Sequence, residues 1–181
     1  MALIMQKYIV KFLLIFFLSS SAHALESVAK EAYLVDLSTG QVLLDKNSKN
    51  QTFPSSMTKM MTALVAFEKL SKGLISLDQK FLVSKKAWRM GGSKMFVEVD
   101  KKVTVEDLLR GIIVQSGNDS SIVIAEGISG SEEAFAGEMN LLAQKIGLEG
   151  SNFVNSSGMP ADNHYTTARD LAIIAEYTIK N

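Results

Sequence analysis

Cysteine is absent from this sequence of 181 residues, and its 19 basic and 19 acidic side chains give a formal net charge of zero. Without cysteine the chain forms no disulfide, no thiolate metal site and no thiol nucleophile. The neutral charge balance gives no electrostatic basis for binding nucleic acid or an anionic membrane surface. No residues have the spacing of metal ligands and no phosphate-binding loop occurs. We therefore expect neither a metal nor another cofactor, and no nucleic-acid partner.

The N-terminal segment has the composition of a secretory signal peptide. A positively charged start precedes the apolar run Phe12–Leu18, and a segment of small residues that ends in Ala22-x-Ala24 follows it. A membrane anchor is the alternative, but a spanning helix needs about 20 apolar residues, more than this run provides. We expect residues 1–24 to be a signal peptide that is cleaved after Ala24, so that the mature chain is exported.

The mature chain is long enough for one domain with a hydrophobic core. Two β-prone runs, Ala32–Val35 and Val42–Leu44, flank a Ser-Thr-Gly turn and predict a β-hairpin. Pro54, followed by apolar residues at mostly helical spacing up to Gly73, predicts a helix. The looser region that follows contains strand-like pieces such as Met95–Val99. Because two strands alone make no stable sheet, either further strands are missing at the C-terminus or the sheet is completed in another way.

The second half of the chain is predicted to be mainly helical. The segments Thr104–Asp107 and Thr167–Asp170 resemble capping boxes at helix starts, and Ser131 is expected to cap the helix that follows it. Glu132, Glu133 and Glu138 are expected on a solvated helix face. The four predicted helices span Val105–Val114, Ser120–Ile128, Glu132–Ile146 and the segment from the Thr167 box almost to Asn181.

Ser56 and Lys59 lie three residues apart where the first long helix begins. On a helix this spacing places both side chains on one face. A serine hydroxyl needs a base to act as a nucleophile, and a lysine amine accepts a proton only when its pKa is lowered. Burial against apolar neighbours would lower it, and the positive end of the helix dipole would add to the shift. The pattern therefore offers Ser56 as a nucleophile with Lys59 as its base.

Two observations limit this hypothesis. Histidine is the usual base for serine, and His164 is the only histidine of the mature chain, although no G-x-S-x-G elbow occurs. We therefore treat a Ser-His-Asp triad as the less favoured alternative and expect His164 to order its loop. The S-x-x-K pattern also occurs at Ser27–Lys30, without a helix start, and we interpret that copy as chance.

A second polar cluster, Ser116-Gly117-Asn118, lies between two predicted helices. Ser116 can relay a proton between Lys59 and a leaving group. Asn118 can offer an amide donor to a substrate carbonyl and an acceptor to the lysine. Since an ordinary turn between helices uses the same residue types, the cluster is informative only together with Ser56 and Lys59.

S-x-x-K followed by S-G-N resembles the penicillin-recognising serine acyl-transferases. The closer resemblance is to the low-molecular-weight D-alanyl-D-alanine carboxypeptidases of peptidase family S11. It implies an α+β, β-lactamase/transpeptidase-like fold, present here as an N-terminal β-hairpin and a helical region. The resemblance runs from about Ala29 to the end of the sequence. Four stretches carry it: Ala32–Gly40, Pro54–Thr62, Leu108–Asp119 and Gly158–Leu171.

The resemblance also implies roles for the two motifs. Ser56 would be the acylated nucleophile, Lys59 its general base, Ser116 an aid to proton transfer and Asn118 a substrate-binding residue. The oxyanion hole would use the Ser56 backbone N–H and an N–H from a sheet strand. The implied substrates are the D-Ala-D-Ala ends of peptidoglycan stem peptides in the periplasm or cell envelope, and β-lactams are the implied covalent inhibitors.

The sequence departs from the family pattern at the third motif, because no Lys-Thr-Gly occurs in it. In the family this motif lies on an edge strand that grips the substrate carboxylate. We therefore expect residues 25–181 to be the N-terminal part of the domain, lacking its C-terminal strands. Activity is expected to be impaired unless a complementing C-terminal fragment supplies them. The alternatives are a non-catalytic remnant and a β-lactamase-like hydrolase of the same fold.

Overall fold

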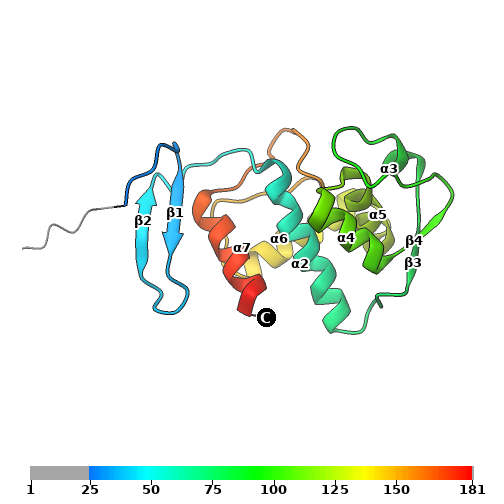
Figure 1. Ribbon diagram of the computed structural model, residues 1–181, viewed down its shortest axis with the longest axis horizontal. Coiled ribbons are helices and arrows are strands. Elements are labelled where there is room, and N and C mark those ends of the chain that lie inside the picture. Colours follow the sequence, from blue (N-terminus) through cyan, green and yellow to red (C-terminus); the bar gives the residue numbers. More distant parts are fainter. Residues whose placement is uncertain (1–24, 181) are drawn as a thin grey trace, which may run out of the picture.

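The computed structural model describes residues 25–180, so the expected signal peptide, residues 1–24, lies outside the described part. A β-hairpin stands at one end, a group of helices forms the centre, and a small sheet lies at the far end (Figure 1). Within residues 25–180 no helix combines the length and the apolar character that crossing a membrane requires.

The predicted hairpin is confirmed. Strands β1 (Ala32–Val35) and β2 (Val42–Lys46) pair antiparallel, with Leu34 opposite Leu44. The carbonyl of Asp36 accepts the N–H of Gly40, which has a positive φ of 73° and so closes the turn. The hairpin packs against helix α7 (Ala168–Lys180). Several large apolar side chains of the hairpin are exposed, among them Leu34, Val42 and Leu43.

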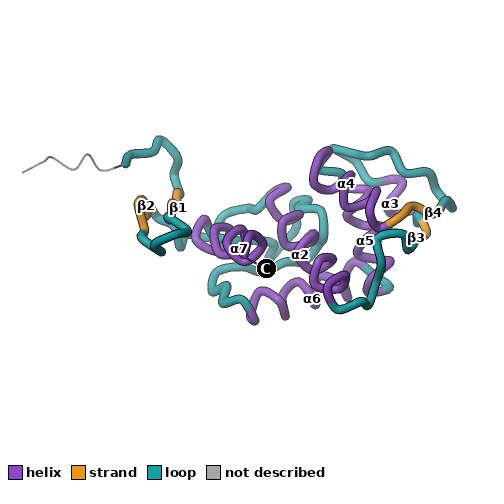
Figure 2. The backbone as a smooth tube through the Cα atoms, turned by 60° about the horizontal axis from the view of Figure 1, so that its bottom comes forward, coloured by secondary structure: helices purple, strands orange, loops and turns teal. Residues whose placement is uncertain are grey.

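Helix α2 (Thr58–Ser71) is the central element of the helical region and follows a 3₁₀ turn at Ser55–Met57. It contacts four other helices (Figures 1 and 2). Its buried face supplies Met61, Leu64 and Val65 to the core. The surrounding helices are α4 (Val105–Gln115), α5 (Asn118–Ser129), α6 (Glu132–Lys145) and α7. The largest core side chains that they and the adjoining loops add are Leu108, Ile122, Ile124, Phe135, Met139, Phe153 and Ile174.

The predicted helix starts are confirmed by their hydrogen bonds. The Thr104 hydroxyl accepts the N–H of Asp107, and the Ser131 hydroxyl accepts the N–H of Ala134. The Thr167 hydroxyl accepts the N–H of Asp170 at 3.0 Å. Each bond satisfies one of the N–H groups that a helix start leaves without an intrahelical partner. Helix α5 begins at Asn118, two residues before the predicted start.

The region between α2 and α4 was poorly predicted. It contains a second antiparallel pair, β3 (Lys80–Leu82) and β4 (Lys102–Thr104), and a short helix α3 (Lys85–Arg89). The strand-like segment Met95–Val99 is not a strand. Two of its backbone N–H groups bond to a side chain instead, because the Asp119 carboxylate accepts the N–H groups of Met95 and Val97.

Candidate active site

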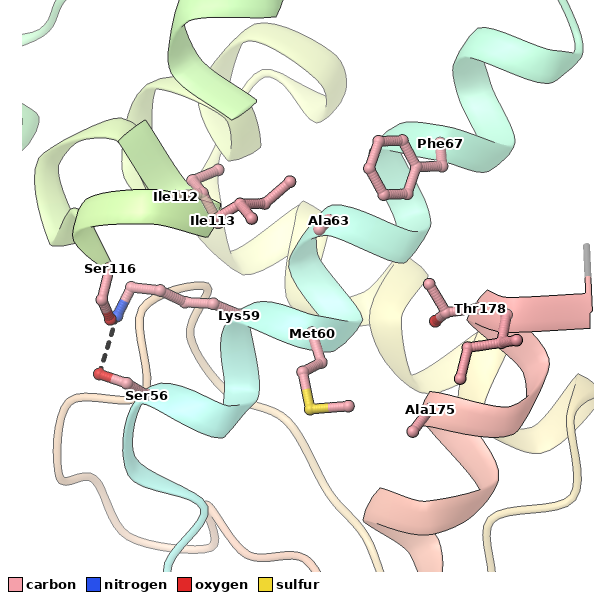
Figure 3. Close-up of a pocket in the computed structure, with 11 residues that line it drawn as sticks. Ser56, Lys59, Met60, Ala63, Phe67, Ile112, Ile113, Ser116, Ala175 and Thr178 are labelled. Carbon is pink, nitrogen blue, oxygen red and sulfur yellow. Dashed lines mark hydrogen bonds between the residues drawn. The ribbon is translucent and has the colours of Figure 1, made fainter. Parts of the chain in front are cut away.

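Ser56 and Lys59 occupy the 3₁₀ turn and the first turn of α2, and the structure brings their side chains together. Lys59 Nζ lies 3.2 Å from Ser56 Oγ (Figure 3). Ser56 is exposed, whereas Lys59 is 5% exposed. A buried amine thus stands beside an accessible hydroxyl. By contrast, Ser27–Lys30 lies in an irregular segment before β1, as expected for a chance match.

Three oxygen atoms surround the amine of Lys59. Besides Ser56 Oγ, these are Asn118 Oδ1 at 2.8 Å and the backbone carbonyl of Ser157 at 2.6 Å. The amide of Asn118 is oriented by its other end, because Asn118 Nδ2 donates to the carbonyl of Gly91 at 2.8 Å. A carbonyl or amide oxygen can only accept, so two N–H groups of the lysine are committed to Asn118 and Ser157. A neutral amine then has only its lone pair left for the proton of Ser56.

Burial of the Lys59 side chain lowers its pKa from 10.5 to about 8. Desolvation disfavours the charged ammonium form, and this is the first of the two causes expected from the sequence. A pKa of about 8 leaves about one lysine in ten as the free amine at pH 7, against about one in three thousand at the ordinary value. The site therefore contains a usable base near neutral pH.

The lowered pKa of Lys59 predicts a dependence of stability on pH. Between about pH 8 and 10.5 the unfolded lysine retains a proton that the folded one has lost. The unfolding free energy of the wild type should therefore rise with pH across this window, measured relative to a Lys59→Met variant that lacks the titrating group. Urea unfolding at several pH values measures the difference. A wild-type minus variant difference that stays constant from pH 7 to 10.5 would contradict the lowered pKa.

Ser116 and Asn118 lie at the junction of α4 and α5. Ser116 ends α4 in the left-handed conformation, with φ of 54°. Figure 3 shows it at the same end of the pocket as Ser56 and Lys59. The N–H of Asn118 donates to the carbonyl of Ser93 at 2.8 Å, which fixes the start of α5 against the preceding loop. The structure thus gathers all four residues that the sequence singled out.

His164 does not approach this arrangement as a base. Its Nδ1 accepts the N–H of Val154 at 3.0 Å, which places the proton of the neutral ring on Nε2. Nε2 lies 2.8 Å from Thr58 Oγ1. Burial lowers the pKa of His164, which favours this neutral form. Since both ring nitrogens are engaged by a backbone N–H and a threonine, His164 orders its loop and the Ser-His-Asp alternative loses its base.

Two residues of the loop 152–165 that the sequence did not single out, Ser157 and Gly158, contact Lys59 and the turn that carries Ser56. This loop is closed by paired backbone hydrogen bonds between Asn152 and Tyr165. Ser157 supplies the carbonyl that binds Lys59. Gly158 has φ of +83°, and a Cβ on it would lie 1.8 Å from the carbonyl oxygen of Ser55. A glycine in the sequence can indicate a tight backbone contact of this kind. The contact of Ser157 is made by its main-chain carbonyl, which every residue type has, so the sequence could not indicate it.

The site opens into a pocket of about 450 Å³ between α2, α4 and α7. Its polar end is formed by Ser56, Lys59 and Ser116, and the rest of its wall is mainly apolar (Figure 3). The residues of that wall are Met60, Ala63, Phe67, Ile112, Ile113, Ala175, Thr178 and Ile179.

Residues 19–181 match the peptidase S11 family model, described as D-alanyl-D-alanine carboxypeptidase. The chain is 45% identical over 152 residues to the D-alanyl-D-alanine carboxypeptidase DacF of Bacillus subtilis, covering 84% of this chain and 39% of DacF. It is 37% identical over 157 residues to DacC of Escherichia coli, covering 83% of this chain and 39% of DacC. The chain therefore spans about two fifths of the length of these relatives.

Solved structures give the same result for the fold. The D-alanyl-D-alanine carboxypeptidase DacD from Francisella tularensis matches with a TM-score of 0.85 and 37% identity, covering 87% of this chain and 38% of that one. Penicillin binding protein 5 from Haemophilus influenzae matches with a TM-score of 0.83 and 36% identity, covering 86% and 46%. These likenesses confirm the α+β, transpeptidase-like fold expected from the sequence, over a part of its full extent.

Proposed function

This chain belongs to the peptidase S11 family of D-alanyl-D-alanine carboxypeptidases, and from this premise we propose that Ser56 is the nucleophile of a serine acyl-transfer site. The proposed reaction removes the terminal D-alanine of peptidoglycan stem peptides through an acyl-enzyme. One observation carries the proposal. The buried amine of Lys59 has two N–H groups bound by Asn118 and Ser157, and it faces the exposed hydroxyl of Ser56.

The first step is proton transfer coupled to attack. Neutral Lys59 takes the hydroxyl proton of Ser56 as Oγ forms a bond with the carbonyl carbon of the penultimate D-alanine. The resulting tetrahedral intermediate collapses with cleavage of the C–N bond. The proton held by Lys59 passes through the Ser116 hydroxyl to the nitrogen of the departing D-alanine. Water then hydrolyses the Ser56 ester, so that the shortened peptide is released and the serine hydroxyl is restored.

Asn118 has two tasks in this scheme. Its Oδ1 accepts a hydrogen bond from Lys59, so the side chain helps to hold the base. Its Nδ2 donates to the Gly91 carbonyl at 2.8 Å and lies 3.7 Å from Met159 Sδ, and in this scheme the N–H that faces the weakly accepting sulfur turns to a substrate carbonyl. β-Lactams would enter as covalent inhibitors, because their strained amide presents an acyl carbon to the same hydroxyl.

We propose that full carboxypeptidase activity also needs the part of the family domain that this sequence does not contain. Two observations support this. The chain spans about two fifths of its relatives, and no Lys-Thr-Gly motif occurs in it. The apolar wall of the pocket and the exposed apolar side chains of the hairpin would be covered by a complementing C-terminal fragment. Export to the periplasm or cell envelope is likewise proposed, from the composition of residues 1–24.

Labelling with a fluorescent penicillin tests the proposal. The 181-residue chain is incubated alone and together with the C-terminal part of B. subtilis DacF, which begins where the match to this chain ends. We expect one penicilloyl group per chain on Ser56 in the mixture and weak or no labelling without the fragment, since removal of one oxyanion donor costs about 10²–10³ in rate. Ser56→Ala should abolish the label, and Ser27→Ala, in the other S-x-x-K copy, should leave it intact.

The outcomes separate the alternatives. A folded mixture that takes no label contradicts the proposal and favours a non-catalytic remnant. A label on a residue other than Ser56 also contradicts it. Rapid release of hydrolysed penicillin, with no adduct that persists, favours the β-lactamase-like alternative.

A further inference from the structure

Glu132 is a buried carboxylate that the sequence led us to expect in solvent. It is the first residue of α6, and it is 5% exposed, whereas the side chain of its neighbour Glu133 is 77% exposed. One oxygen, Oε2, forms an ion pair with Lys86 Nζ of α3 at 2.9 Å. The other, Oε1, accepts two hydrogen bonds from Ser156, from its N–H at 2.9 Å and from its hydroxyl at 2.7 Å. Hydrogen bonds to a charged oxygen are about twice as strong as those between neutral groups.

Ser156 belongs to the loop 152–165 and stands directly before the residue that binds Lys59. The carbonyl of Ser156 accepts the hydroxyl of Thr62 at 2.7 Å, and the carbonyl of Ser157 accepts Lys59 Nζ at 2.6 Å. Thr62 and Lys59 lie on neighbouring turns of the same face of α2. Both serines are almost completely buried. The loop segment is therefore held between Glu132 on one side and α2 on the other.

We propose that Glu132 is a positioning residue for acylation, whose carboxylate holds Ser156 so that the adjoining Ser157 carbonyl aims the Lys59 amine at Ser56. This inference rests on the proposed function of Ser56 and Lys59. Glu132 itself touches neither reacting residue. It acts through one residue of the loop, and nothing in the S-x-x-K or S-G-N motifs points to it.

The length of the Glu132 side chain, which sets the position of Oε1, determines where Ser156 and the Ser157 carbonyl lie. The Ser157 carbonyl takes one N–H of the amine, and Asn118 takes the other, so a displaced carbonyl lets the lone pair turn away from Ser56 Oγ. Misplacing a reacting group by about 1 Å can cost about 10²-fold in rate. Since Ser156 binds Oε1 with both of its donors, any side chain of the same length with an oxygen at this place should hold the loop. The negative charge of Glu132 forms the ion pair with Lys86, and it also raises the pKa of His164, against the larger lowering by burial.

Three variants of Glu132 separate the effect of side-chain length from the effect of charge. Glu132→Gln keeps the reach and an acceptor oxygen, Glu132→Asp keeps the charge but is one methylene shorter, and Glu132→Ala loses both. We expect the acylation rate constant with penicillin, in the complemented protein, to fall less than about threefold for Gln and about tenfold or more for Asp and Ala. The dissociation constant of the non-covalent penicillin complex should not change. Glu133→Ala, which removes the exposed partner of the same Lys86, is the matched control and should retain the wild-type rate.

A second measurement needs no activity. Carbon-13 NMR of the Lys59 Cε in the 181-residue chain follows the protonation of this lysine, and the signal is assigned by its loss in Lys59→Met. Releasing the loop admits water to the amine, so the midpoint should rise from near pH 8 towards 10.5 in Glu132→Ala and stay near 8 in Glu132→Gln.

The results are decisive in each direction. If Asp preserves the rate and Gln loses it, the charge matters and the positioning inference is wrong. If all three variants have the wild-type midpoint and the wild-type rate, Glu132 has only a structural role. If Glu132→Ala does not fold, the comparison of Gln with Asp still decides. If wild-type Ser56 is never acylated, the proposed function fails, while the Lys59 midpoints still report whether Glu132 places the amine.

Discussion

Replacing Lys59 with methionine should lower the rate constant for acylation of Ser56 by penicillin about 10²–10⁴-fold, the range that general base catalysis typically contributes. Methionine has nearly the length of lysine but carries no group that can take the serine proton. The apolar side chain suits the buried position, where lysine is 5% exposed, so the loss should come from the missing base and not from unfolding. The substitution also removes the hydrogen bonds that Lys59 Nζ donates to Asn118 Oδ1 and to the Ser157 carbonyl.

Stopped-flow measurement of penicillin acylation in the complemented protein checks this expectation. The pH profile adds a second test, because the wild-type rate should rise about tenfold from pH 7 to pH 9 as an amine of pKa about 8 loses its proton. Lys30→Met, in the chance S-x-x-K copy, is the control and should have the wild-type rate and profile. A Lys59→Met rate within threefold of wild type would show that another group accepts the proton.

Replacing Gly158 with alanine should lower the free energy of unfolding by about 2–5 kcal/mol, through left-handed strain and overpacking together. Gly158 has φ of +83°, and the added Cβ would lie 1.8 Å from the carbonyl oxygen of Ser55 and 2.4 Å from its carbon. Both atoms are backbone, so no side chain can rotate away to make room. The turn that carries Ser56 must move, and folded protein that remains should also lose penicillin labelling.

Gly130 provides the matched control for this substitution. It has φ of +80°, nearly the same as Gly158, but nothing lies within 4 Å of the place where a Cβ would stand. Gly130→Ala therefore measures the left-handed strain alone, about 1–2 kcal/mol. Urea unfolding of the two variants isolates the clash as the difference between them. Equal destabilisation would mean that the contact between Gly158 and the Ser55 turn is not tight.

The elements that the sequence predicted well are those with local signals. The caps at Thr104 and Ser131 are side chain to backbone bonds within four residues, and the β1–β2 turn is closed by its own glycine. The proximity of Ser56 to Lys59 follows in the same way from their spacing of three residues, from the 3₁₀ turn into the first turn of α2. Such features need no knowledge of what packs around them.

The features that the sequence did not reveal depend on residues far apart in the chain. Strands β3 and β4 have three residues each, too few for a visible alternation, and they pair across about 20 residues. Met95–Val99 is rich in apolar residues like a strand, but its N–H groups at Met95 and Val97 donate to the Asp119 carboxylate. Glu132 has the position of a solvated first-turn glutamate, and only the arrival of Ser156 and Lys86 makes its burial favourable.

The left-handed ending of α4 at Ser116 has a consequence for how this chain would respond to selection. A non-glycine residue at φ of 54° carries a conformational cost of about 1–2 kcal/mol, and glycine at the same place would avoid it. A library selected only for heat resistance should therefore replace this serine with glycine and discard the hydroxyl proposed to relay the proton. Stability favours glycine at this position and the proposed proton relay favours serine, and the chain has the serine.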